Sequence, residues 1–171
     1  MKTNILLIGM PGVGKTFNAK ILSQKLGFPH ISVDDMITVG ALQMGIENKR
    51  KMPDPDFVAL ENKMLLSLKN IENSVIDTGA SAIYSKEAMD ILRTTSLIVY
   101  LYDDITKIKE RFENRGKIHL IGMKNEDTPF EQIFHERESL YEDYADLKLD
   151  VSEHRENIPD EIIRFFKNLY H

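Results

Sequence analysis

A chain of 171 residues with 42% hydrophobic and 29% charged residues is typical of one soluble globular domain. The net charge of −5 argues against a broad nucleic-acid-binding surface, and no apolar stretch approaches the length of a membrane span. Because cysteine is absent, a disulfide framework, a zinc–thiolate site and a thiol nucleophile are excluded. We therefore expect a cytoplasmic, monomeric protein in which residues 1–171 form a single domain.

The first motif is a glycine-rich loop that follows a short apolar run. Asn4–Ile8 has the composition of a strand buried on both faces, and residues 9–16, GMPGVGKT, fit the pattern G-x-x-x-x-G-K-[ST]. Apolar residues at helical spacing follow over residues 17–26, and Gly27 is placed to end that helix. Strand, glycine loop and helix in this order predict a phosphate-binding loop.

The chemistry of the motif gives each of its residues a role. Successive backbone N–H groups of such a loop turn inward and hold phosphate oxygens. Lys15 is expected to reach the outer phosphates as a catalytic cation, and the hydroxyl of Thr16 is placed to ligate Mg²⁺. The loop therefore predicts ATP and Mg²⁺ as cofactors. The expected nucleotide contacts are Gly12, Val13, Gly14, Lys15, Thr16 and Phe17.

Two carboxylates follow the second predicted strand, residues 28–33. Asp34 and Asp35 stand at its carboxyl end, and ligands of open parallel sheets bind beyond that edge. Asp34 is therefore a candidate to orient or deprotonate a substrate hydroxyl. The alternative is that Asp34 or Asp35 only caps a helix beginning at Met36.

Residues 34–70 form the candidate acceptor-binding region. A helix expected over residues 36–44 precedes a polar stretch with two prolines, and helical spacing returns from Phe57 to residue 70. The polar stretch contains the basic cluster Lys49-Arg50-Lys51. This cluster is either a solvated face or, if it turns toward the crevice, a partner for an acidic substrate.

A third apolar run, residues 74–77, ends in Asp77 and is followed by a turn of small residues. A carboxylate that closes a buried strand resembles the second metal-holding element of nucleotide-binding folds, so Asp77 is a candidate for the magnesium shell. In the turn, Gly79 and Ala80 would let a substrate or the γ-phosphate approach the backbone.

The second half of the chain continues the alternation of strands and helices. Spacing predicts strands over residues 96–101 and 147–151, and helices over 85–92, 105–114 and 130–144 and after Pro159. Residues 116–129 lack periodicity and fit either a lid that closes over the phosphates or a plain surface loop. Five strands interleaved with helices predict an α/β fold, with a parallel sheet covered on both faces.

Taken in order, these residues resemble the shikimate kinase family over nearly the whole chain. The glycine loop, the spacing from it to Asp34 and the turn at residues 79–81 carry the resemblance. In addition, Arg115 looks like the family's adenine-side arginine and Arg137 like its late substrate-binding arginine. The resemblance implies a P-loop nucleoside-kinase-like fold and transfer of the γ-phosphoryl group of ATP to a hydroxyl of a small anionic metabolite, with shikimate the first candidate. The acceptor contacts it implies are Asp34, Gly79, Ala80 and Arg137.

The departures from the family pattern fall in the acceptor pocket. Val58 stands where the family carries an arginine that grips the shikimate carboxylate, so Glu61 lacks its neutralising partner unless Arg50 or a nearby lysine substitutes. Ser32 stands at the family's earlier metal-side aspartate, a role that Asp77 could take. Two alternatives are a nucleoside monophosphate kinase and a nucleotide-binding regulatory domain without catalysis; the absence of an arginine just after Asp77 counts against the first.

Overall fold

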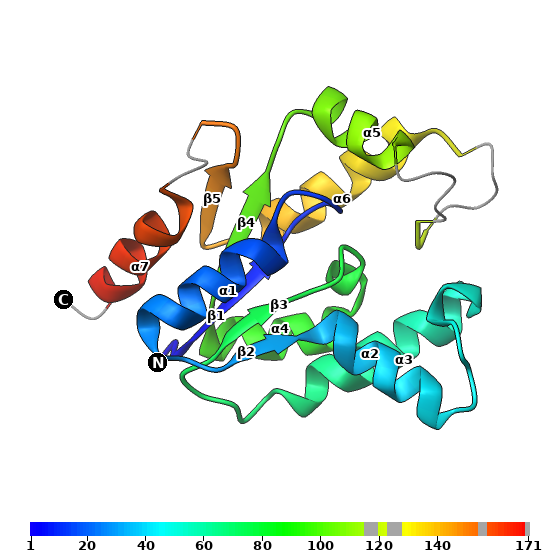
Figure 1. Cartoon of the computed structure of the whole chain (residues 1–171), viewed down its shortest axis with the longest axis horizontal. Coiled ribbons are helices and arrows are strands. Elements are labelled where there is room, and N and C mark those ends of the chain that lie inside the picture. Colours follow the sequence, from blue (N-terminus) through cyan, green and yellow to red (C-terminus); the bar gives the residue numbers. More distant parts are fainter. Residues whose placement is uncertain (115–119, 123–127, 154–156, 170–171) are drawn as a thin grey trace.

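A parallel five-stranded sheet lies at the centre of the computed structural model, which describes residues 1–114, 120–122, 128–153 and 157–169 (Figure 1). All neighbouring strands in this sheet run parallel. Their order across the sheet is β2 (His30–Ser32), β3 (Val75–Asp77), β1 (Asn4–Ile8), β4 (Ser96–Tyr102) and β5 (Leu147–Asp150).

Helices cover both faces of the sheet, as the sequence predicts. Figure 1 shows α1 and α7 in front of the strands and α4 and α6 behind them. The helices are α1 (Lys15–Leu26), α2 (Val33–Gln43), α3 (Asp54–Ser67), α4 (Lys86–Thr95), α5 (Ile105–Glu113), α6 (Phe130–Tyr144) and α7 (Ile158–Asn168). Two short 3₁₀ turns, η1 (Lys49–Lys51) and η2 (Ala82–Tyr84), complete the described elements. The predicted α/β class is therefore confirmed.

The core explains why the strand sequences are apolar without alternation. The four apolar residues of β1 are fully buried because helices cover both sides of the sheet. β1 lies between β3 and β4, with Leu7 beside both Asp77 and Val99. Asn4, also fully buried, donates to the carbonyl oxygen of Ile71 at 2.6 Å. The Asn4 contact holds the amino end of β1, and the ladder sets the carboxyl ends of β1, β3 and β4 side by side.

The second strand is shorter than predicted, and this changes where Asp34 lies. β2 ends at Ser32 and α2 begins directly at Val33. The Ser32 hydroxyl caps the helix by accepting a hydrogen bond from the Asp35 N–H at 3.3 Å. The prediction that Asp34 or Asp35 caps a helix from Met36 is therefore wrong, since both carboxylates lie in the first turn.

Other helix boundaries also differ from the predictions. α3 begins at Asp54, before the predicted Phe57. Pro55 lies in its first turn, where backbone N–H groups have no partner within the helix, so a proline is tolerated there. α4 runs on to Thr95, and the side chain of its first flanking residue, Ser85, makes no capping bond. Apolar spacing after Pro159 also predicts Leu169 in the packing face of the last helix, and this prediction is wrong because Leu169 is 42% exposed.

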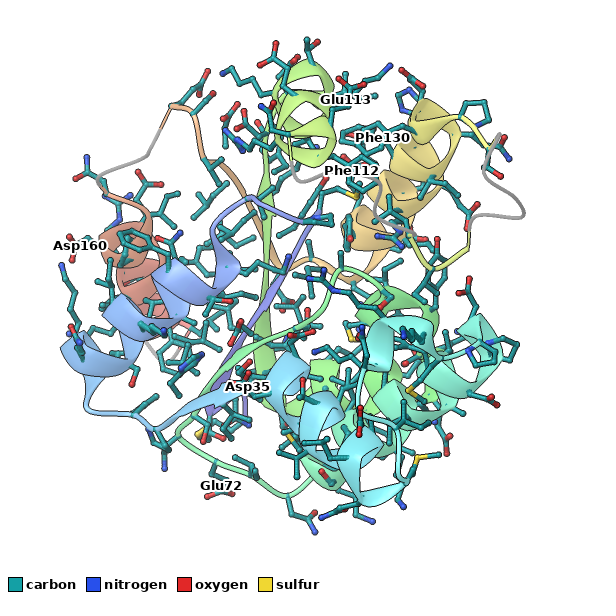
Figure 2. The ribbon with its side chains drawn as sticks, turned by 45° about the vertical axis from the view of Figure 1, so that its right-hand side comes forward. Asp35, Glu72, Phe112, Glu113, Phe130 and Asp160 are labelled. Carbon is teal, nitrogen blue, oxygen red and sulfur yellow. The ribbon has the colours of Figure 1, made fainter. Side chains whose placement is uncertain are left out.

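The predicted lid, residues 116–129, lies mostly outside the described residues. The elements on its two sides are held together by an aromatic contact, since the rings of Phe112 in α5 and Phe130 in α6 lie 5.2 Å apart (Figure 2). Within the segment, the Gly122 N–H donates to Asp54 Oδ2 at 3.0 Å. Among the helices described, none has the length and apolar character needed to span a bilayer.

Candidate active site

The glycine loop between β1 and α1 forms a preshaped cradle. Gly9 and Gly14 have φ values of 143° and 91°, and a side chain on Gly9 would meet the Leu101 carbonyl oxygen at 2.2 Å. The ammonium group of Lys15 lies inside the loop, where it donates to the carbonyl oxygens of Gly9 at 2.8 Å and Met10 at 3.0 Å. The loop therefore has both the backbone shape and the cation that phosphate binding requires.

A cavity of about 530 Å³ opens on the α5 side of this loop. Gly12, Val13, Gly14 and Phe17 line it, and Phe17 is 65% exposed, so this ring belongs to the cavity wall and not to the packing face of α1. The opposite wall includes Arg111, a residue that the sequence analysis did not select.

Arg111 is fixed by the buried Asp103. Its Nη2 lies 2.6 Å from Asp103 Oδ2, and its Nη1 donates to the Gly12 carbonyl oxygen at 3.4 Å. Arg111, one helix turn before the predicted Arg115, thus faces the phosphate loop. This orientation depends on how α5 packs and could not be seen in the sequence. Arg115 itself lies outside the described residues.

A second cavity, of about 740 Å³, opens on the other side of the loop. It gathers side chains from α1, the start of α2, η1 and the ends of β2 and β3. The predicted site residues that line it are Gly12, Gly14, Lys15, Thr16, Phe17, Asp34, Asp77, Gly79 and Ala80. It is called the acceptor cleft below. Because Gly12, Gly14 and Phe17 line both cavities, the loop and the start of α1 separate them.

Asp77 and Thr16 meet at the base of the acceptor cleft. The Thr16 hydroxyl donates to Asp77 Oδ2 at 2.5 Å, and the side chain of Asp77 is only 3% exposed. The other carboxylate oxygen, Oδ1, lies 2.6 Å from Nε2 of His30, a residue that sequence reasoning missed. Two donors from distant parts of the chain therefore hold one buried carboxylate.

This oxygen pair fits the requirements of Mg²⁺. The ion prefers hard oxygen ligands and usually takes only one or two protein groups, together with substrate phosphates and water. Within the described residues no cluster of three or more His, Asp or Glu side chains forms a complete metal cage. Thr16 and Asp77 therefore suit a magnesium ion that arrives with a nucleotide.

The Asp34 carboxylate faces the acceptor cleft and is paired with Lys49. Its side chain is 60% exposed, and Lys49 Nζ lies 2.6 Å from its Oδ2 and 2.7 Å from its carbonyl oxygen. Arg50 lines the same cleft. Of the basic cluster, Arg50 therefore turns toward the crevice, and Lys49 pairs with Asp34 at its edge.

Arg137 is not brought into the open cleft. It is 1% exposed, its Nη2 donates to the Ile121 carbonyl oxygen at 2.7 Å, and its Nη1 has no hydrogen-bond partner among the described residues. One turn further along α6, the Tyr141 hydroxyl donates to the Ala80 carbonyl oxygen at 2.6 Å. Arg137 thus lies on the helix that supports the small-residue turn.

Glu61 is buried against the same turn. Its Oε2 accepts a hydrogen bond from the Ser81 hydroxyl at 2.7 Å, whereas Oε1 has no partner within the part of the chain that the structure describes. Burial raises the pKa of Glu61 to about 7, although the Ser81 bond and the charge of Arg137 oppose this shift. A side chain on Gly79 would approach Glu61 Oε1 to 2.8 Å, so a larger residue here would displace the buried carboxylate. Because position 58 is a valine, no arginine there can bond to Glu61, and the hydroxyl of Ser81 supplies a hydrogen bond to this carboxyl group instead.

Taken together, the geometry suits phosphoryl transfer. A cradle for phosphates and an oxygen pair for magnesium lie in one cleft with the exposed carboxylate of Asp34. Such transfers depend mainly on positioning and on neutralising charge, which these groups provide.

Comparison with known proteins agrees with this geometry. The family model described as shikimate kinase matches residues 11–167. A shikimate kinase of Dehalococcoides mccartyi is 32% identical over 157 residues, which cover 91% of this chain and 87% of that protein. One of Thermodesulfovibrio yellowstonii is 28% identical over 97% of this chain and 96% of its own.

Solved structures show the same fold. The shikimate kinase from Acinetobacter baumannii in complex with shikimate superposes with a TM-score of 0.79 at 22% identity, over 98% of this chain and 94% of that one. The enzyme from Aquifex aeolicus gives a TM-score of 0.73 at 25% identity, over 98% of both chains.

Proposed function

The chain belongs to the shikimate kinase family, and from this premise we propose that it transfers the γ-phosphoryl group of ATP to a hydroxyl group of shikimate. The observation that carries the proposal is that Lys15, Thr16 and Asp34 line one cleft. A phosphate cradle and a hydroxyl-binding carboxylate are the two parts that such a reaction must bring together.

For the nucleotide, we assign the phosphates to the loop and the base to the cavity beside α5. Lys15 Nζ would exchange its two carbonyl acceptors for phosphate oxygens, which offer stronger, charge-assisted bonds. Phe17 and Arg111 line the cavity that opens beyond the loop and can contact the base. The role of Arg115 on the adenine side remains a prediction.

Thr16 and Asp77 would hold Mg²⁺, which when bound neutralises charge on the phosphates. Both residues are already joined by a hydrogen bond, so their oxygens are ordered before the nucleotide binds. This order lowers the entropy cost of building the site.

At the acceptor, Asp34 would position the hydroxyl and take its proton. The hydroxyl oxygen forms the new bond to the γ-phosphorus, the bond from that phosphorus to the β–γ bridging oxygen breaks, and ADP leaves. The released proton passes to the Asp34 carboxylate. The ammonium group of Lys49 holds Asp34 at two points, because it pairs with the Asp34 carboxylate and donates to the Asp34 backbone carbonyl oxygen.

Two arginines are proposed contacts for the carboxylate of shikimate. Arg50 lines the acceptor cleft together with Asp34, Gly79 and Ala80. Arg137 lies on α6, and its Nη1 is without a partner in the described ranges, but its side chain is buried. In the described arrangement Arg50 is therefore the more accessible of the two.

We also propose that residues 1–171 act as a single monomeric kinase domain in the cytoplasm, where ATP is supplied. Every proposed contact comes from one chain, since residues 34–70 supply Asp34 and Arg50 to the acceptor cleft and Lys49 as the partner of Asp34. Light scattering coupled to size-exclusion chromatography measures the oligomeric state. A dimer at assay concentration contradicts the proposed monomer.

The test is formation of ADP with ATP, Mg²⁺ and shikimate, with the phosphorylated product identified by mass spectrometry. A parallel preparation of Lys15→Ala controls for contaminating kinases, because it removes the loop cation. Shikimate-dependent turnover that is absent in this control supports the proposal. Turnover with nucleoside monophosphates only, or with none of shikimate, the sugar acids and the nucleoside monophosphates, contradicts it.

A further inference from the structure

His30, the first residue of β2, is a polar group of the cleft that the proposed reaction leaves without a role. Its ring is 19% exposed in the wall of the acceptor cleft, and its Nε2 lies 2.6 Å from Asp77 Oδ1. Because a carboxylate oxygen accepts hydrogen bonds, the geometry assigns the ring hydrogen to Nε2. His30 and Thr16 therefore each donate to one oxygen of Asp77.

The sheet shows why this contact matters for Asp77. In the ladder, the strand neighbours of Asp77 are Leu7 on β1 and Ser32 on β2. Leu7 has no polar side-chain atom, and the hydroxyl of Ser32 already caps α2. Neither neighbour holds the carboxylate, so on the side away from Thr16 the described contact is the one from His30.

We propose that His30 is a positioning residue that fixes the Asp77 carboxylate for binding of magnesium beside Thr16. The inference rests on the proposed use of ATP with magnesium and deepens it. Without the donor at Oδ1, the carboxylate would turn about its last side-chain bond, and ordering it would oppose metal binding. Outer partners of this kind typically change metal affinity by a factor of ten to a hundred.

The test compares ADP binding with and without the metal. Isothermal titration calorimetry measures the dissociation constant for ADP in Mg²⁺ and in EDTA, and the ratio of the two isolates the contribution of magnesium. His30→Phe and His30→Ala remove the donor, whereas His30→Gln can place an amide N–H near the same point. His135→Phe, at a histidine side chain that is 67% exposed on α6, is the matched control.

In both donor-free variants we expect the factor by which Mg²⁺ tightens ADP binding to fall about tenfold. The affinity for ADP in EDTA should be unchanged. His30→Gln should recover most of the loss, and His135→Phe should match the wild type. In an Asp77→Asn background, His30→Ala should have no further effect, because the carboxylate it positions is gone.

Two results overturn the inference: an unchanged magnesium-dependent gain in His30→Ala, or an equal loss of affinity in Mg²⁺ and in EDTA, which indicates a merely structural role. Failure of the proposed function looks different. In that case the wild type binds ADP with the expected dependence on magnesium and on His30 but does not phosphorylate shikimate.

Discussion

Glu61 makes the stability of this protein depend on pH in a direction opposite to that of most carboxylates. Burial raises its pKa from the ordinary value of 4.5 to about 7, so the folded state holds the proton more tightly than the unfolded state. The stability contributed by the proton is fully present below pH 4.5 and is lost as pH rises through 7. At about 1.4 kcal/mol per pH unit, the full effect is about 3 kcal/mol.

The substitution Glu61→Gln removes the titration and keeps the shape. We expect the free energy of unfolding of the variant, relative to the wild type, to increase by roughly 2 to 3 kcal/mol between pH 5 and pH 8. Urea unfolding followed by circular dichroism at both pH values measures this difference, in which the other titrating groups cancel. Glu72→Gln, at an exposed carboxylate on the lower edge of the molecule in Figure 2, should leave the pH profile unchanged.

Parallel pH profiles for Glu61→Gln and the wild type would refute the reasoning. They would mean that Glu61 has the same proton affinity in the folded and unfolded states. The unpaired Oε1 would then have to be compensated by a group that the described contacts do not include.

The remaining predictions concern the acceptor cleft. Gly79→Ala should destabilise the fold by about 1 to 3 kcal/mol in urea unfolding, since the new side chain meets Glu61 Oε1 at 2.8 Å; an unchanged midpoint contradicts this. Arg50→Ala should raise KM for shikimate roughly tenfold, because a charge-assisted bond is lost, while Lys51→Ala should not; equal KM values would assign the acceptor carboxylate to another cation. Asp34→Asn should lower kcat by about a hundredfold or more in the ADP-release assay, and a near-normal rate removes Asp34 from catalysis.

The sequence was sufficient for the phosphate loop, because its spacing is local and its neighbours are a strand and a helix. Asp77 could be selected for a similar reason, as the carboxylate at the end of a buried run. His30 could not, because its contact with Asp77 joins residues 47 positions apart and depends on β2 lying beside β3. Sequence spacing alone does not show which strands become neighbours.

Arg137 and Arg111 also show that sequence spacing alone does not place a side chain. Arg137 was predicted at the site and is buried away from the open cleft, whereas Arg111 was not predicted and faces the phosphate loop. The resemblance placed Arg137 on the substrate, yet the packing of α6 buries its guanidinium beside Ile121. In the sequence, nothing distinguishes Arg111 from the other basic residues of its helix. In the structure, the buried Asp103 holds it toward the phosphate loop. In both cases tertiary packing decides where a long, flexible side chain ends.

The ammonium group of Lys15 has a consequence for the catalytic cycle. It is held inside the loop by two carbonyl oxygens of that loop while no nucleotide is bound. Because both acceptors belong to the loop itself, the same two bonds are available to Lys15 again once ADP has left. The resting enzyme would remain ready for its substrate.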